Sequence, residues 1–137
     1  MNGLIERYKS FLDEGKTERE CVRRTIALAE ANGYRRLESV ESLKCGDKVY
    51  VEDYEKAIAL FHIGSEPMEK GMNILGAHID SPRLDIKMNP LYESEGLVYL
   101  DTHYYGGIKK YQWVAMPLAI HGVVVKTTGE KINVVLG

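Results

Sequence analysis

The chain has 137 residues, with 18 basic and 20 acidic side chains and a formal net charge of −2. This length suits one domain or one domain plus the start of another, and 45% hydrophobic residues are enough for a core. The balanced charge, without a basic stripe, argues against a nucleic-acid partner, and no apolar run reaches the roughly 20 residues of a membrane span. The polar N-terminus lacks a signal-peptide core, and Cys21 and Cys45 lack metal-type spacing. We therefore expect a cytoplasmic protein with reduced thiols and no membrane partner.

The first third of the chain predicts two helices. Apolar residues at helical spacing over residues 4–12 indicate an amphipathic helix that ends near Gly15. Thr17 and Glu20 form a capping-box pattern, in which each side chain can bond to the backbone of the other residue. A second helix is therefore expected over residues 18–31.

Strand-like segments follow the two helices. They cover residues 47–51, 57–63, 72–79, 97–100, 113–125 and 132–136. The second and third are nearly continuous apolar runs, which suit strands buried on both faces of a mixed or parallel sheet. Asn89–Pro90 predicts a turn, and residues 126–131 predict a hairpin loop. We expect an α/β first part and a β-rich last third, in a chain truncated inside its last strand; a small domain whose last strand ends at its edge is the alternative.

The sharpest chemical pattern is formed by His78 and Asp80. Side chains two residues apart on a strand share a face, so both would emerge at the end of the predicted strand, where open α/β sheets bind ligands. A metal-ligating imidazole usually has its other nitrogen held by a carboxylate, and this spacing could supply such a pair. The same residues also fit a surface histidine beside a turn at residues 80–82, so the spacing alone leaves both interpretations open.

The surrounding residues carry a family resemblance. Residues 74–87 resemble the zinc-ligand segment of the aspartyl aminopeptidase and vacuolar aminopeptidase I family, which reads His-x-Asp-Ser-Pro before an alternating apolar stretch ending in lysine. Tyr105–Gly107, Trp113 and the glycine–valine strand from Gly122 match further family features in the same order. Many members have an Asp-Arg-Asp run after the tryptophan. Residues 114–117 read Val-Ala-Met-Pro instead, as in the bacterial branch called probable aminopeptidase 1, which puts acidic-residue specificity in doubt.

The resemblance implies a zinc exopeptidase that removes N-terminal amino acids from peptides. Its site would hold two metal ions, either zinc or, as alternatives, cobalt or manganese, which activate a bridging water. His78 would be a zinc ligand, and Asp80 would be the catalytic-site carboxylate that orients it. The remaining ligands and the general base have no match here, and the other histidines are not spaced as partners of His78: they are His62, His103 and His121. We therefore expect an incomplete N-terminal portion that is inactive alone.

The resemblance also implies a domain organisation. Residues 1–87 would form the N-terminal portion of the catalytic domain, and residues 88–137 would begin a β-rich dimerisation domain. Dimers would build a larger, hollow homo-oligomer. A non-catalytic α+β binding or assembly module, which would hold no metal, is the alternative.

Overall fold

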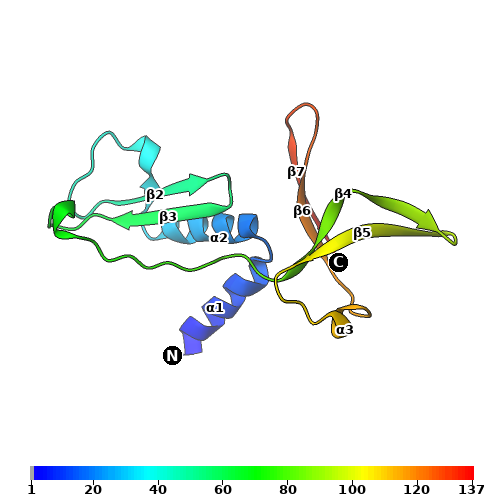
Figure 1. Ribbon diagram of the computed structural model, residues 1–137. Coiled ribbons are helices and arrows are strands. Elements are labelled where there is room, and N and C mark those ends of the chain that lie inside the picture. Colours follow the sequence, from blue (N-terminus) through cyan, green and yellow to red (C-terminus); the bar gives the residue numbers. More distant parts are fainter. Residues whose placement is uncertain (1) are drawn as a thin grey trace. The chain divides into compact units, whose positions relative to one another are not determined.

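The computed structural model describes residues 2–137 (Figure 1). These residues form two compact units, residues 2–79 and 80–137. Both helices and strands are present, which confirms the predicted α/β class. No helix in this described range has the length and apolar character needed to cross a membrane. The predicted domain boundary between residues 87 and 88 falls inside a strand, so the two assigned domains stay a prediction.

The first unit begins with the two predicted helices, followed by a small sheet. Its elements are α1 (Asn2–Glu14), α2 (Glu18–Ala31), β1 (Arg35–Arg36), β2 (Lys48–Asp53) and β3 (Ala57–His62), with short 3-10 helices at Leu37–Ser39 and Met68–Lys70. The capping box is formed as predicted. The Glu20 amide donates to the Thr17 hydroxyl at 3.3 Å, and the Thr17 amide donates to the Glu20 carboxylate at 2.9 Å. These bonds satisfy amides at the start of α2 that have no partner inside the helix.

The sheet has the order β1-β2-β3, with β1 parallel and β3 antiparallel to β2. Figure 1 shows α2 lying along β2 and β3, and the buried core comes from these elements. Its buried hydrophobic residues are Cys21, Val22 and Ala29 from α2 and Val49 and Tyr50 from β2. The Tyr50 hydroxyl donates to the Glu30 carboxylate at 2.7 Å, so this buried ring keeps a polar partner.

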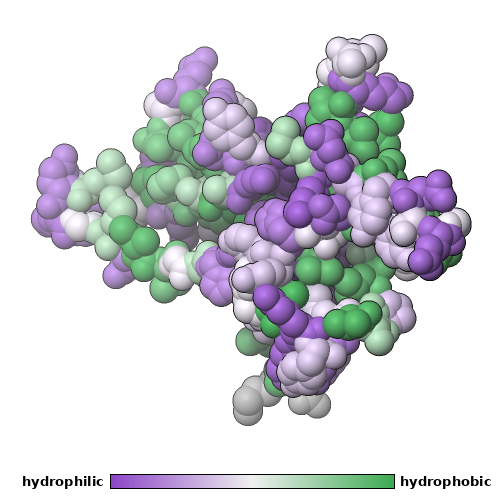
Figure 2. All heavy atoms as spheres, turned by 45° about the vertical axis from the view of Figure 1, so that its right-hand side comes forward, coloured by the Kyte–Doolittle hydropathy of each residue, from purple (hydrophilic) through white to green (hydrophobic). Residues whose placement is uncertain are grey.

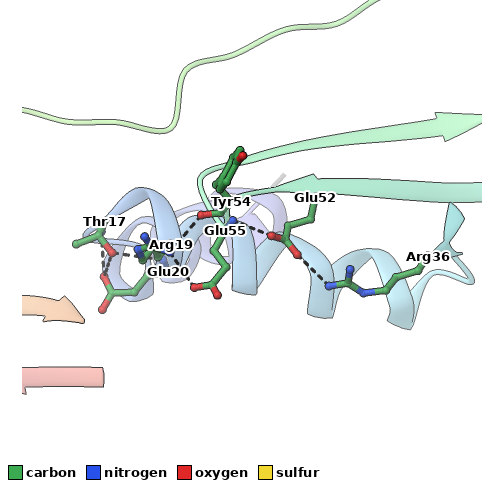
Figure 3. A network of polar contacts seen from close by, with 7 residues as sticks. All are labelled: Thr17, Arg19, Glu20, Arg36, Glu52, Tyr54 and Glu55. Carbon is green, nitrogen blue, oxygen red and sulfur yellow. Dashed lines mark hydrogen bonds and ion pairs between the residues drawn. The ribbon is translucent and has the colours of Figure 1, made fainter. Parts of the chain in front are cut away.

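A polar network joins α2 to the turn between β2 and β3 (Figure 3). The Arg19 guanidinium donates to the Glu55 carboxylate at 2.8 Å and to the Tyr54 carbonyl at 3.2 Å. Glu52 accepts from the Glu55 amide at 2.7 Å and from the Arg36 guanidinium at 3.0 Å. Tyr54 and Glu55 have φ angles of 48° and 59°, which side-chain-bearing residues seldom adopt. The network therefore holds a turn whose backbone conformation is unfavourable by itself.

The expected buried strand at residues 72–79 is absent, and this prediction was wrong. Residues 71–82 have no regular secondary structure, Ile74 is 79% exposed and Leu75 is fully exposed. An apolar run becomes a buried strand only if neighbouring strands pair with it and helices cover it. Within residues 2–137, no strand pairs with this segment. His78 and Asp80 therefore do not emerge from the end of a strand, contrary to the prediction.

The second unit consists of two hairpins joined by a short helix. Its elements are β4 (Arg83–Ser94), β5 (Leu97–Tyr105), α3 (Lys110–Trp113), β6 (Ile120–Val125) and β7 (Lys131–Leu136). Strands β4 and β5 pair antiparallel, as do β6 and β7. The predicted strands at 97–100 and 132–136 and the hairpin loop after Val125 are confirmed.

Two predictions in this unit were wrong. Residues 110–113 are helical and only residues 120–125 form a strand, so the expected strand at 113–125 is shorter than predicted. Asn89–Pro90 makes no turn, because β4 continues to Ser94. The pairing with β5 shifts register between Ile86 and Leu91, and this irregularity accommodates a proline that cannot donate a ladder hydrogen bond.

Candidate functional site

His78 and Asp80 lie on either side of the division between the two units. His78 is exposed in the irregular segment 71–82, and Asp80 is half-buried at the start of the second unit. Chain geometry alone keeps their Cα atoms within about 7 Å of each other. The short sequence spacing, and not a strand, is therefore what keeps the two residues near each other.

The carboxylate of Asp80 has a defined partner in the second unit. The Tyr105 hydroxyl donates to Oδ2 of Asp80 at 2.6 Å. This distance lies in the short range typical of a hydroxyl that donates to an ionised carboxylate. Tyr105 is the last residue of β5, where it pairs with Arg83, the first residue of β4. The end of the β4–β5 hairpin thus supplies the group that holds Asp80.

Polar side chains surround Tyr105 on one face of this hairpin. The Arg83 guanidinium lies 4.2 Å from the centroid of the Tyr105 ring, and its Nε donates to Asp85 at 2.7 Å. Residues directly opposite each other in an antiparallel pair share a face, which adds His103, the partner of Asp85. His103 is exposed, and its Nδ1 lies 3.4 Å from the Tyr104 carbonyl oxygen. Arg83, Asp85 and His103 therefore lie with Tyr105 on one polar face of the hairpin.

Gly106 lies near Pro82 in the irregular segment after Asp80. Its φ is 71°, and a Cβ at this position would lie 3.4 Å from the Cα and 3.5 Å from the side chain of Pro82. The Tyr-Gly pair therefore lies beside the Asp80–Pro82 segment and binds it through the hydroxyl of Tyr105. The sequence motif contained both residues, but nothing in it indicated that they meet Asp80.

The described residues fit only part of a zinc site. A catalytic zinc normally takes three protein ligands and keeps one position open. In the described part of the chain, no group of three or more His, Cys, Asp or Glu side chains is arranged to hold a metal ion. His62 ends β3, while His103 and His121 lie in β5 and β6. The roles of His78 and Asp80 as a metal ligand and its carboxylate therefore stay a prediction.

Comparison with known proteins gives a consistent family. Residues 11–136 match the family described as Aminopeptidase I zinc metalloprotease (M18). A protein named probable M18 family aminopeptidase 1, from Clostridium acetobutylicum, is 57% identical over 98% of this chain and 30% of its own length. The crystal structure of an M18-family aminopeptidase from Thermotoga maritima gives a TM-score of 0.91 at 40% identity, covering 98% of this chain and 30% of that one. The crystal structure of Aminopeptidase I from Borrelia burgdorferi gives a TM-score of 0.90 at 40% identity, and the match covers 98% of this chain and 34% of that one.

These matches confirm the resemblance found in the sequence, including its bacterial branch. The chain spans about 30% of the length of the curated relatives it matches, which agrees with the expected N-terminal portion. The match includes the His78–Asp80 segment, both hairpins and the helix between them. The chain belongs to the Aminopeptidase I zinc metalloprotease (M18) family.

Proposed function

We propose that the whole protein is a zinc-dependent aminopeptidase that removes N-terminal amino acids from peptides. In this proposal His78 is a zinc ligand, and Asp80 is the carboxylate that orients the imidazole. The observation that carries it is the membership in a zinc metalloprotease family across residues 11–136, which include both residues. The hydrogen bond between Tyr105 and Asp80 supports it further, because an orienting carboxylate must itself be held in place.

The chemistry of the two side chains suits these roles. A neutral imidazole binds a metal ion through one nitrogen, and its other nitrogen carries the proton. A carboxylate that accepts this proton in a hydrogen bond fixes the tautomer and makes the ligating nitrogen more basic. Bound zinc, two ions per complete site, would lower the pKa of a bound water and polarise the scissile carbonyl. Cobalt or manganese could replace zinc, since the imidazole and carboxylate groups also bind these ions.

The proposal extends to partners and location. Peptides are the expected substrates, and we propose a cytoplasmic homo-oligomer in which dimers build a larger assembly. Exposed apolar residues on the second unit support association, since Met88 is 97% exposed and Val98 is 74% exposed. Figure 2 shows such hydrophobic atoms reaching the surface between hydrophilic ones. The alternative of a non-catalytic module is not favoured, because the family match covers nearly all of the chain.

A chimera tests the proposed function. These 137 residues would replace the matched segment of the Clostridium acetobutylicum relative, which is 57% identical. We expect the chimera to bind zinc and release N-terminal amino acids. His78→Ala should lower the zinc content and reduce activity at least about 100-fold, and Asp80→Asn should weaken zinc binding about 10- to 100-fold. The matched control is His62→Ala, at the end of β3. Full activity and metal content in His78→Ala would refute the proposal.

A further inference from the structure

We infer that Tyr105 is a positioning residue that holds the Asp80 carboxylate, so that Asp80 can orient the His78 imidazole as proposed above, and that the positive φ of Gly106 turns the chain directly after Tyr105. The inference deepens the proposed function and rests on it for its catalytic meaning. It gives a role to the Tyr-Gly pair, which the family resemblance singled out without a physical reason. Its basis is the geometry at the end of the β4–β5 hairpin.

The hairpin also holds the ring of Tyr105. Tyr105 pairs with Arg83 across the strands, and the Arg83 guanidinium lies 4.2 Å from the ring centroid. A cation at this distance is attracted by the electrons of the ring. Arg83 is itself held by Asp85 at 2.7 Å. A continuous row of contacts therefore runs from Asp85 through Arg83 and Tyr105 to Asp80.

The segment that carries Asp80 depends on such outside contacts. Residues 71–82 have no regular secondary structure, so no ladder of backbone hydrogen bonds holds the carboxylate in position. Tyr105 binds this segment at Asp80, and Gly106 follows directly after Tyr105, near Pro82. The φ of 71° at Gly106 strains residues with a side chain, so this conformation favours glycine. The hydrogen bond from Tyr105 therefore helps to locate the end of the segment.

The Tyr105 hydroxyl contributes more to position than to fold stability. Tyr105 is 39% exposed, and the pairing of β4 with β5 on both sides of their register shift does not involve this hydroxyl. Removing the hydroxyl leaves the ring, its contact with Arg83 and the strand pairing in place. What changes is the orientation of Asp80, because Oδ2 loses a donor at 2.6 Å. An orienting carboxylate that changes rotamer no longer holds the imidazole of His78 in one arrangement.

Solution NMR of the 137-residue chain tests this inference with Tyr105→Phe, Asp80→Ala and the double variant. The Hα–Hβ couplings of Asp80 report its side-chain rotamer, and the ¹⁵N shifts of the His78 imidazole report its surroundings. We expect Tyr105→Phe to change the rotamer ratio of Asp80 about 2- to 10-fold, the effect of one hydrogen bond. The His78 shifts should move in the same variant. Tyr104→Phe, the adjacent tyrosine of β5, is the matched control and should change neither signal.

The double variant shows whether Tyr105 acts through Asp80. If it does, Tyr105→Phe shifts the His78 signals in the original chain but not in the Asp80→Ala background, where the acceptor of the hydrogen bond is absent. A merely structural tyrosine would move them equally in both backgrounds. The inference is overturned if the Asp80 couplings stay unchanged in Tyr105→Phe, or if His78 fails to respond. These signals need no metal and no activity, so failure of the inference is distinguishable from failure of the aminopeptidase proposal, which the chimera detects.

Discussion

Individual side chains in the first unit show how a local charge arrangement depends on pH. The Glu55 amide and then the Arg36 guanidinium lower the pKa of Glu52 below its ordinary value. The hydrogen bonds from both donors stabilise the ionised carboxylate in the folded state, and these hydrogen bonds are absent from the unfolded chain. A carboxyl group with a lowered folded pKa stabilises the fold above its unfolded pKa. That contribution is lost as the pH falls through the folded pKa.

Replacing Glu52 with glutamine should therefore destabilise the first unit at neutral pH and much less in acid. The urea midpoint of unfolding should fall at neutral pH, and the difference from the unsubstituted chain should shrink below the ordinary pKa range of glutamate. Circular dichroism during urea titration at both pH values measures this. Glu69→Gln, on an exposed 3-10 helix, is the control. A difference in urea midpoint that stays constant with pH would show that the charge of Glu52 does not contribute to the stability of the fold.

At the scale of elements, the start of α2 depends on a reciprocal cap. The Thr17 hydroxyl accepts from the Glu20 amide, while the Glu20 carboxylate accepts from the amides of Thr17 and Lys16. Negative side chains also interact favourably with the N-terminal end of the helix dipole, where Glu18 and Glu20 lie. The cap supports the helix that carries much of the buried core.

Thr17→Ala should lower the free energy of unfolding by about 1 kcal/mol, the typical effect of losing a side-chain cap. Thr17→Ser keeps the hydroxyl and should retain most of the stability. Thermal unfolding followed by circular dichroism compares the two variants. Equal losses in both variants would mean that the methyl group, not the hydroxyl, is what contributes.

The same scale explains what the sequence could predict. The first two helices and the hairpin loop after Val125 were predictable, because caps, helical spacing and turn residues act over a few neighbouring positions. The structure of segment 72–79 was not predictable. Its apolar composition indicates a preference for burial, but it does not show whether partner strands are present to bury it. The contact of Tyr105 with Asp80 could not be predicted from the sequence for a similar reason. It joins residues 25 positions apart through a strand pairing that local patterns do not specify.

For the whole molecule, the buried core is concentrated in the first unit. All five buried hydrophobic residues of the described chain lie in α2 and β2. The second unit consists of two hairpins, each a sheet of two strands, and isolated two-stranded hairpins are marginally stable. Stability in the described chain is therefore unevenly distributed.

Hydrogen exchange should show this difference directly. We expect the amides of α2 and β2 to exchange at least about tenfold more slowly than those of β4 to β7, because local opening of the hairpins exposes little apolar surface. Mass spectrometry of peptic peptides after deuterium labelling measures both regions in one sample. Equal protection of the two units would contradict the uneven distribution, and would indicate that association covers the hairpins.

Pro90 in β4 has a consequence for aggregation. A hairpin of two strands leaves two outer edges whose amides and carbonyls can pair with a strand of another chain. Pro90 lies within β4, inside the stretch where the register with β5 shifts. A bulge or irregularity of this kind bends and twists a strand, so an incoming strand would meet an irregular edge along β4. The proline for which a turn was predicted therefore marks the part of the hairpin that is least suited to growth into a larger sheet.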